Sequence, residues 1–314
     1  MNRKRSWAQA AQYAGGQIRK NWGLYLLLLP AFILLICFSY KPMYGVLIAF
    51  KDYRNSLGIV GSAWADPWYK YFVKFFNSYQ FWPTIKNTLI LSLYGMAASF
   101  PLPITLALVI NQMRAKRFRK LFQTVSYLPH FISTVVMVGL ILIWLSPSTG
   151  LFSNICRGVG VQQVPNLMGT ESAFSSLYVW SDVWQHTGWD SIIYVAALSA
   201  VDPSLYEAAT VDGANRWQKM CYIDFPMLLP TAVILLIMRV GSIMSLGFEK
   251  VYLMQNNLNL GASEIISTYV YKIGIISSQY SYSAAINLFN TIINLILLVA
   301  VNQISKKLSD NSLW

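Results

Sequence analysis

The chain of 314 residues is 55% hydrophobic and only 11% charged, and its mean hydropathy is +0.45. Soluble domains carry about 25% charged residues, so this composition excludes an ordinary soluble protein. Apolar runs long enough to cross a bilayer predict an all-α, polytopic membrane protein with about six transmembrane helices. The net charge of +12 comes mainly from Lys and Arg between the apolar runs, where it indicates topology and gives no support to nucleic-acid binding.

The N-terminal part of the chain predicts a basic arm followed by one span. Residues 1–23 carry several basic side chains, which indicate a cytoplasmic arm: Arg3, Lys4, Arg5, Arg19 and Lys20. Residues 24–50 are predicted to form the first transmembrane helix, interrupted by Pro30 and Pro42.

Residues 51–85 are rich in Trp, Tyr and Phe and are predicted to form an external segment. Aromatic residues at this density either form a belt or packing layer at the membrane interface or stack against sugar rings or a partner. The belt or packing interpretation is the simpler one.

A core transmembrane domain is predicted over residues 86–305. Its first span covers 87–110, and the following turn carries five basic residues that mark the cytoplasmic side: Arg114, Lys116, Arg117, Arg119 and Lys120. The next span, 121–145, returns outward and leads into an external loop at 146–176.

The fourth span, 174–201, is unusually polar and aromatic. Polar groups in lipid are costly, so they are expected to face a cavity, another subunit or the outer interface. We therefore predict that this helix lies near the substrate pathway, with these candidate residues: Trp180, Trp184, Gln185, Trp189 and Asp190.

A polar segment at 202–226 separates two apolar runs. Asp202 is a good N-cap and Pro203 suits the first position of a helix. Gly213 predicts a left-handed turn that ends this helix. A second short helix is predicted over 216–223, and Pro226 is predicted to open the next span.

The last two spans are predicted at 226–246 and 283–301, with an external segment at 248–283 between them. Arg239 must pair or reach water, because a lone guanidinium in hydrocarbon is costly. Asn287, Asn290 and Asn294 form a polar stripe, which either lines the pathway or hydrogen-bonds neighbouring helices. Asn287 and Asn290 are added to the candidate pathway residues. The tail, 306–314, is predicted to be cytoplasmic, like the N-terminus.

The segment 202–226 resembles the EAA loop of ABC importer permeases, whose pattern is Glu-Ala-Ala, three residues, Gly, nine residues, Ile-x-Leu-Pro. Six positions match, and Phe225 replaces the Leu. In that family the loop is a coupling helix that docks on a cytoplasmic ATPase. The resemblance therefore implies a type I importer transmembrane domain, with coupling residues Glu207, Ala208, Ala209, Asp212, Gly213, Ala214, Ile223 and Pro226. We call 202–226 the coupling loop.

Other segments are similar to the permeases of polysaccharide and oligosaccharide importers, the group that contains the alginate importer and the LplB-type permeases. The segments are 49–53, 58–64, 87–89, 127–133, 188–194 and 312–314. This resemblance implies a multi-pass protein of the cytoplasmic (inner) membrane that forms half of the translocation pathway of an importer of oligosaccharides or polysaccharides. It also implies a second, homologous permease, two ATPase subunits and an extracytoplasmic solute-binding protein as partners.

The sequence contains no nucleotide-binding G-x-x-x-x-G-K-[ST] motif, so ATP and Mg²⁺ are expected on the partner ATPase and no cofactor on this chain. Cys37, Cys156 and Cys221 have no metal-like spacing, and no catalytic motif is present, so we predict no metal site and no enzyme activity. Two other classes stay open. An ion-gradient-driven transporter would need intramembrane acids such as Asp182 and Asp190. A membrane scaffold would not co-purify with an ATPase.

Overall fold

The protein is described by a computed structural model that covers residues 20–161 and 163–309. The basic arm up to residue 19 and the tail from residue 310 lie outside the described residues. The chain divides into two compact units, Met1–Lys70 and Tyr71–Trp314, and this division falls inside the aromatic segment 51–85. The regular secondary structure of the described residues is entirely helical, apart from one isolated β-bridge between Lys51 and Trp64. The all-helical architecture is therefore confirmed.

The first unit contains one continuous helix over Trp22–Phe50. It is composed of α2 (Trp22–Leu35), a π-helical turn η1 (Ile36–Tyr40), α3 (Lys41–Met43) and a 3₁₀ segment η2 (Tyr44–Phe50). Its 29 residues are long and apolar enough to cross a membrane. The π turn comes directly before Pro42, whose missing N–H interrupts the regular helical hydrogen bonds.

A small folded loop follows this helix and includes α4 (Gly58–Gly61). The Lys51 ammonium is buried and donates to the carbonyl oxygens of Ile59 (2.7 Å) and Ser62 (3.1 Å). The same ammonium lies 4.9 Å from the ring centre of Trp64. Part of the aromatic segment thus packs within its own unit, as the simpler interpretation predicts.

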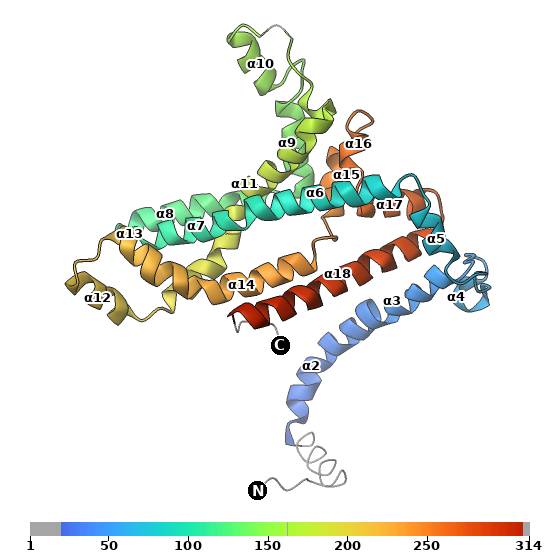
Figure 1. Cartoon of the computed structure of the whole chain (residues 1–314), viewed down its shortest axis with the longest axis horizontal. Coiled ribbons are helices and arrows are strands. Elements are labelled where there is room, and N and C mark those ends of the chain that lie inside the picture. The colour runs from blue at the N-terminus through green and yellow to red at the C-terminus, as the bar shows by residue number, and fades with distance from the viewer. Residues whose placement is uncertain (1–19, 162, 310–314) are drawn as a thin grey trace. The chain divides into compact units, whose positions relative to one another are not determined.

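The second unit is built around α11 (Glu171–Ser199), which packs against α6 (Phe81–Ser99) and α7 (Pro101–Asn111). On the other side of the unit, α14 (Phe225–Gly241) packs along α18 (Tyr280–Ser309) (Figure 1). Shorter elements complete it: α5 (Lys70–Phe76), α8 (Lys116–Tyr127), η3 (Leu128–Phe131), α9 (Thr134–Trp144), α10 (Leu151–Gly158), η4 (Leu167–Gly169), α12 (Pro203–Val211), α13 (Arg216–Lys219), η5 (Met220–Asp224), α15 (Phe248–Met254), α16 (Leu260–Ser263), α17 (Ile266–Tyr271) and η6 (Lys272–Ile276).

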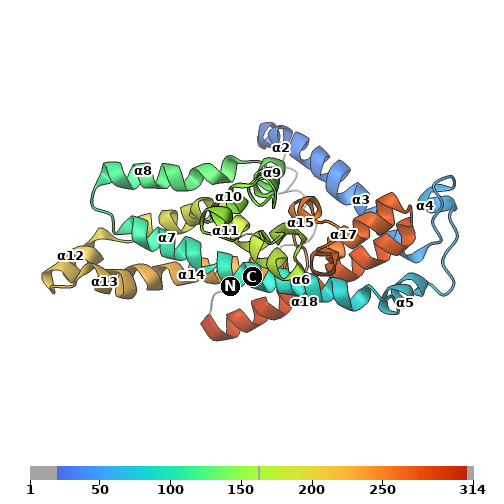
Figure 2. The same cartoon turned by 90° about the horizontal axis from the view of Figure 1, so that it is seen from above.

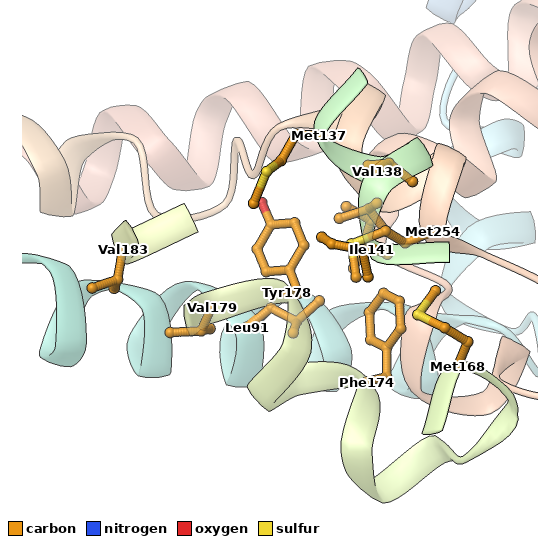
Figure 3. Packing of buried hydrophobic residues seen from close by; sticks show 12 residues of the cluster. Leu91, Met137, Val138, Ile141, Met168, Phe174, Tyr178, Val179, Val183 and Met254 are labelled. Carbon is orange, nitrogen blue, oxygen red and sulfur yellow. The ribbon is translucent and has the colours of Figure 1, made fainter. Parts of the chain in front are cut away.

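The main hydrophobic core lies where α11 meets α6, α9 and α15. Phe174 and Tyr178 of α11 lie beside Ile141 of α9 and Met254 of α15 (Figure 3). A second cluster joins α7, α11 and α14, and a third joins α5, α17 and α18. The first two clusters fix the helices that carry the polar residues described below.

The predicted span 121–145 is not one straight helix, which corrects the sequence-based expectation. It divides into α8 and α9, which meet at 91°. Pro129 lies in the 3₁₀ turn between them, and Ile132 and Ser133 are extended. Ser133 then caps α9 through a hydrogen bond from the Val136 N–H. Pro129 thus ends the first helix because it cannot donate to the regular pattern.

Within the described residues, four helices are long and apolar enough to cross a membrane, or five if the α8–α9 pair counts as one span. The helix α11 covers the predicted fourth span and is 29 residues long, which gives about 43 Å at 1.5 Å per residue. Its polar side chains make α11 less apolar than the four helices that qualify as membrane spans. Length therefore supports a sixth span at α11, and the contacts of its polar residues explain its composition.

Candidate functional site: the coupling loop and the polar cavities

The first helix of the coupling loop, α12, begins as the sequence predicts. The Asp202 side chain accepts a hydrogen bond from the Ser204 N–H at 2.9 Å, and Pro203 occupies the first helical position. This contact lowers the pKa of the exposed Asp202 carboxyl, because the backbone N–H stabilises its charged form. Among the coupling residues, Glu207 and Ala208 are exposed and Ala209 is half-buried.

The end of α12 is set by Gly213. Its φ of +76° is left-handed, as predicted. The Gly213 N–H donates to the Thr210 carbonyl at 3.1 Å and the Ala214 N–H donates to the Ala209 carbonyl at 2.8 Å. These two bonds form a Schellman motif, which satisfies the last carbonyls of the helix. Asp212 and Gly213 are exposed at the tip, and Ala214 is half-buried. Figures 1 and 2 show α12 at one end of the second unit.

The helix after this tip starts earlier than Pro226, which corrects the prediction that Pro226 opens the span. Asn215 and Gln218 form a capping box at the start of α13, and one continuous helix then runs over Arg216–Gly241. Pro226 lies inside it, two residues after the end of the π turn η5. The π turn already interrupts the regular hydrogen bonds at this point, which lets the helix continue through a proline. Ile223 is half-buried and Pro226 is exposed.

Sequence reasoning missed Asp224, a fully buried carboxylate in the π turn. Its Oδ1 accepts from the Tyr206 hydroxyl (2.5 Å) and the Asn111 amide (3.1 Å), and its Oδ2 accepts from the Gln112 amide (2.6 Å). Burial first, and the bond to Asp224 second, raise the pKa of Tyr206 to about 12. Tyr206 therefore stays a protonated donor at physiological pH. The available signal was an acid at the start of an apolar run, which requires partners.

A cavity of about 600 Å³ lies between α6–α7, α11 and α14; most of its lining is apolar, and we call it polar for the charged pair in its wall. It is lined by Trp189 and Asp190, two of the predicted pathway residues, together with Arg239. The Arg239 guanidinium donates to Asp190 Oδ2 at 2.8 Å and to Ser99 Oγ at 2.5 Å. The expectation that Arg239 pairs is thus confirmed.

A second cavity of about 410 Å³ shares Ser99, Asp190, Arg239 and Ser242 with the first. It extends along α11 to Asp182 and His186. The Lys250 ammonium of α15 contacts Asp182 Oδ1 at 3.2 Å, and His186 Nδ1 lies 3.4 Å from the same oxygen. The acids of α11 are thus paired with cations from α14 and α15, and Asp182, Asp190 and Arg239 line the two cavities.

The predicted pathway residues do not all share one cavity. Trp180 and Trp184 line a separate, mainly apolar cavity of about 480 Å³ beside α9. The Trp180 indole donates to the Tyr94 hydroxyl at 2.8 Å. Gln185 is buried, and its amide donates to the Ile132 carbonyl at 2.7 Å, which holds α11 to the break between α8 and α9.

His130 lies beside these cavities and stacks on the Trp189 ring with a centroid distance of 4.3 Å and an angle of 3°. Its Nδ1 is buried and has no hydrogen-bond partner in the described part of the chain. Trp189 therefore has one ring face occupied by His130.

The Asn stripe of α18 divides by position. Asn294 accepts from the Met244 N–H at 3.0 Å and donates to Ser245 Oγ at 2.7 Å, so it joins α18 to the segment that follows α14. Asn290 is buried and Asn287 is exposed. At Asn294 the structure thus favours the packing alternative. Across residues 20–161 and 163–309, no group of His, Cys, Asp and Glu is arranged to hold a metal.

Comparison with known proteins places these features in a family. Residues 99–310 match the family model described as "Binding-protein-dependent transport system inner membrane component". The chain is 41% identical to the polygalacturonan/rhamnogalacturonan transport system permease protein YteP of Bacillus subtilis (strain 168), over 93% of this chain and 90% of that protein. It is 39% identical to protein LplB of the same organism, over 94% of this chain and 92% of that protein.

Solved structures give the same result. A bacterial ABC transporter involved in the import of the acidic polysaccharide alginate has a chain that is 37% identical, with a TM-score of 0.85, over 95% of this chain and 99% of that chain. The bacterial alginate ABC transporter in complex with an alginate pentasaccharide-bound periplasmic protein has a chain that is 38% identical, with the same TM-score and coverage. The chain therefore belongs to the family of binding-protein-dependent transport system inner membrane components, and it is a multi-pass transport subunit of the inner membrane rather than an enzyme.

Proposed function

We propose that this chain is the permease subunit of an ATP-driven importer of oligosaccharides or polysaccharides, and that the coupling loop receives the motion of an ATPase. The observation that carries the coupling role is the form of α12. It is a short helix without buried residues, ended by a left-handed glycine, with a run of small residues beside an exposed acid. Small residues permit close backbone approach by another subunit.

Glu207 supplies the charge of this surface. It is exposed, and it makes no ion pair with any residue in the described ranges. A carboxylate in this position is free to form a charge-assisted contact with an Arg or Lys of a partner. The ATPase is the partner that a cytoplasmic position of this loop would bring within reach, and ATP and Mg²⁺ would be held there.

The remaining partners follow from the family. A second homologous permease would complete the pathway, a second ATPase would complete the motor, and an extracytoplasmic binding protein would deliver the sugar. ATP-driven closure of the ATPases would bias the permease pair between inward-facing and outward-facing states, which requires that the loop docks with different affinity in the two states. The N- and C-termini would lie in the cytoplasm.

The substrate pathway is proposed to pass the connected polar cavities rather than the apolar one. Sugars need hydrogen-bond partners for their hydroxyl groups and accept aromatic surfaces for their ring faces. The polar cavities offer Ser99, Asp190, Arg239 and Ser242 beside Trp189. Trp180 and Trp184, which line the apolar cavity, remain predicted pathway residues. A polysaccharide substrate is supported by the names of the relatives at 41% and 37% identity.

The coupling role is tested with Glu207→Lys and the matched Glu207→Gln in the assembled importer. We expect Glu207→Lys to abolish uptake while the permease still reaches the membrane, because a reversed charge repels the partner cation. Glu207→Gln keeps the shape and should retain part of the activity. Normal uptake by Glu207→Lys would refute the role. Uptake that follows a proton gradient and continues without ATP would instead support the ion-driven alternative.

A further inference from the structure

The buried acid Asp224 joins three parts of the second unit that are distant in sequence. It belongs to the π turn that leads into α14, Tyr206 belongs to α12, and Asn111 and Gln112 end α7. The carboxylate is fully buried. No cation is paired with it in the part of the chain that the structure describes, so three neutral donors stabilise its charge. A buried acid of this kind is costly unless its donors are held in place.

The helix α12 has few other attachments. None of its residues is buried. Outside its capping turns, its side-chain hydrogen bonds to other elements are the Tyr206–Asp224 bond, a long bond of 3.4 Å from the Asn111 amide to the Tyr206 hydroxyl, and an exposed bond from the Lys219 ammonium to Thr210 Oγ1 at 2.6 Å. The Tyr206–Asp224 bond is the stronger link, because its acceptor is a fully buried carboxylate, whereas the Lys219–Thr210 bond is exposed to water.

The other end of this link leads toward the polar cavity. Asn111 and Gln112 are the last residue of α7 and its C-cap, and α7 packs with α11 and α14 in one cluster that includes Ala107, Leu108 and Tyr194. Tyr194 also lines the 600 Å³ cavity with Asp190 and Arg239. A chain of contacts therefore runs from α12 through Asp224 to the helices that form the cavity wall.

We propose that Asp224 is a positioning residue that clamps α12 to α7, so that displacement of the coupling loop moves α7 together with α14. This inference rests on the proposed coupling role of residues 202–226. Without the clamp, α12 would be connected to the membrane helices mainly through its flanking backbone. Part of its motion would then be lost in local bending.

The test uses the complete importer in lipid vesicles, and the readout is the amount of sugar taken up per ATP hydrolysed. Asp224→Leu removes the acceptors and strands three donors. Tyr206→Phe removes one donor to Asp224 and the long bond from Asn111. Asp224→Asn keeps the shape and one acceptor oxygen, but it is neutral and replaces the other acceptor oxygen by an NH2 donor. We expect this ratio to fall by about tenfold in Asp224→Leu, the size expected for loss of one strong charged hydrogen bond, with smaller losses in Tyr206→Phe and Asp224→Asn. ATP hydrolysis stimulated by the loaded binding protein should persist.

A purely structural role would lower uptake and ATP hydrolysis in proportion and leave the ratio unchanged, and that result would overturn the proposal. Tyr79→Phe removes an exposed phenol in the aromatic segment and serves as the control with an unchanged ratio. If Asp224→Leu does not assemble, Tyr206→Phe decides, together with hydrogen exchange of the α12 amides in the complex. Faster exchange with a lower ratio supports the clamp, and wild-type exchange with a wild-type ratio refutes it.

The Glu207→Lys variant separates this inference from the coupling role itself. If Glu207→Lys is inactive while the Asp224 and Tyr206 variants keep the normal ratio, only the clamp is refuted. If Glu207→Lys transports normally, the coupling role fails first and the clamp falls with it.

Discussion

Arg239 of α14 and Asp190 of α11 form an ion pair at 2.8 Å in the wall shared by the two polar cavities. The side chains are 35% and 32% exposed, so the pair is neither dry nor fully solvated. Since Arg239 also donates to Ser99 of α6, this one guanidinium connects three helices. A pair in this position contributes both to packing and to the electrostatic character of the cavity wall.

Removing one partner of this pair is predicted to destabilise the protein. Asp190→Asn leaves a half-buried guanidinium without its counterion, and we expect a loss of about 1–3 kcal/mol in unfolding free energy, less than for a fully buried pair. The change is measured as the thermal unfolding midpoint in detergent. Glu249→Gln, at an exposed acid in the first turn of α15, is the control and should cost only a few tenths of a kcal/mol. Equal shifts in both variants would show that the pair has no special role.

Gly188 is predicted to be required for the approach of α11 to α8. A Cβ at this position would overlap the carbonyl carbon and oxygen of Ser126, and backbone atoms cannot rotate away. Gly188→Ala should therefore lower the free energy of unfolding by about 1–3 kcal/mol, the usual cost of overpacking. Gly139→Ala is the matched control, because no atom lies within 4 Å of the added methyl group there. Gly139→Ala should leave the free energy of unfolding unchanged or raise it, since alanine favours a helix more than glycine does. A stable Gly188→Ala protein would contradict this packing.

The sequence predicted well those features that are set locally. The caps of α12 at Asp202 and Gly213 depend on neighbouring residues alone, so their geometry was predictable. Proline was less informative, because its effect depends on context. Pro129 separates two helices at 91°, whereas Pro226 lies inside a continuous helix behind a π turn. From the sequence, Pro129 is expected inside one span and Pro226 at the start of another, which is the reverse of what the structure shows.

The contacts of the candidate sites could be predicted only in part. The cost of a charge in the membrane predicted that Arg239 would be paired, but Asp190 lies 49 positions away and could not be identified as its partner. Asp224 was missed because its amide donors come from the end of α7, more than a hundred residues earlier. Trp180 and Trp184 were grouped with Trp189 by sequence proximity, although α11 directs them to different cavities. Helix packing decides these contacts, and the spacing of residues along α11 does not specify it.

The two types of cavity give different predictions for the substrate pathway. If the sugar passes the polar cavities, Trp189→Ala should reduce the uptake rate by about fivefold, the value of one aromatic contact, and Trp189→Phe should restore most of it. Trp184→Ala should have a smaller effect, because this side chain lines the apolar cavity. Uptake is normalised to the amount of assembled complex. If Trp184→Ala reduced uptake more than Trp189→Ala, the pathway would run along the α9 face.

The left-handed turn at Gly213 allows the conformational and the steric roles of this glycine to be separated. A Cβ at this position meets no atom within 4 Å, so within this chain a substitution is opposed only by the φ of +76°. Asn tolerates this conformation and Val does not, and the free energies of unfolding of the two variants are expected to differ by about 1–2 kcal/mol.

If the turn alone matters, Gly213→Asn transports and Gly213→Val does not. If the ATPase must approach the backbone closely, Gly213→Asn folds normally but fails to retain the ATPase in co-purification. We expect the second result, because Asp212 and Gly213 are exposed at the tip of the loop with no packing partner that requires glycine. Normal transport and normal ATPase retention by Gly213→Asn would contradict a close approach at this position.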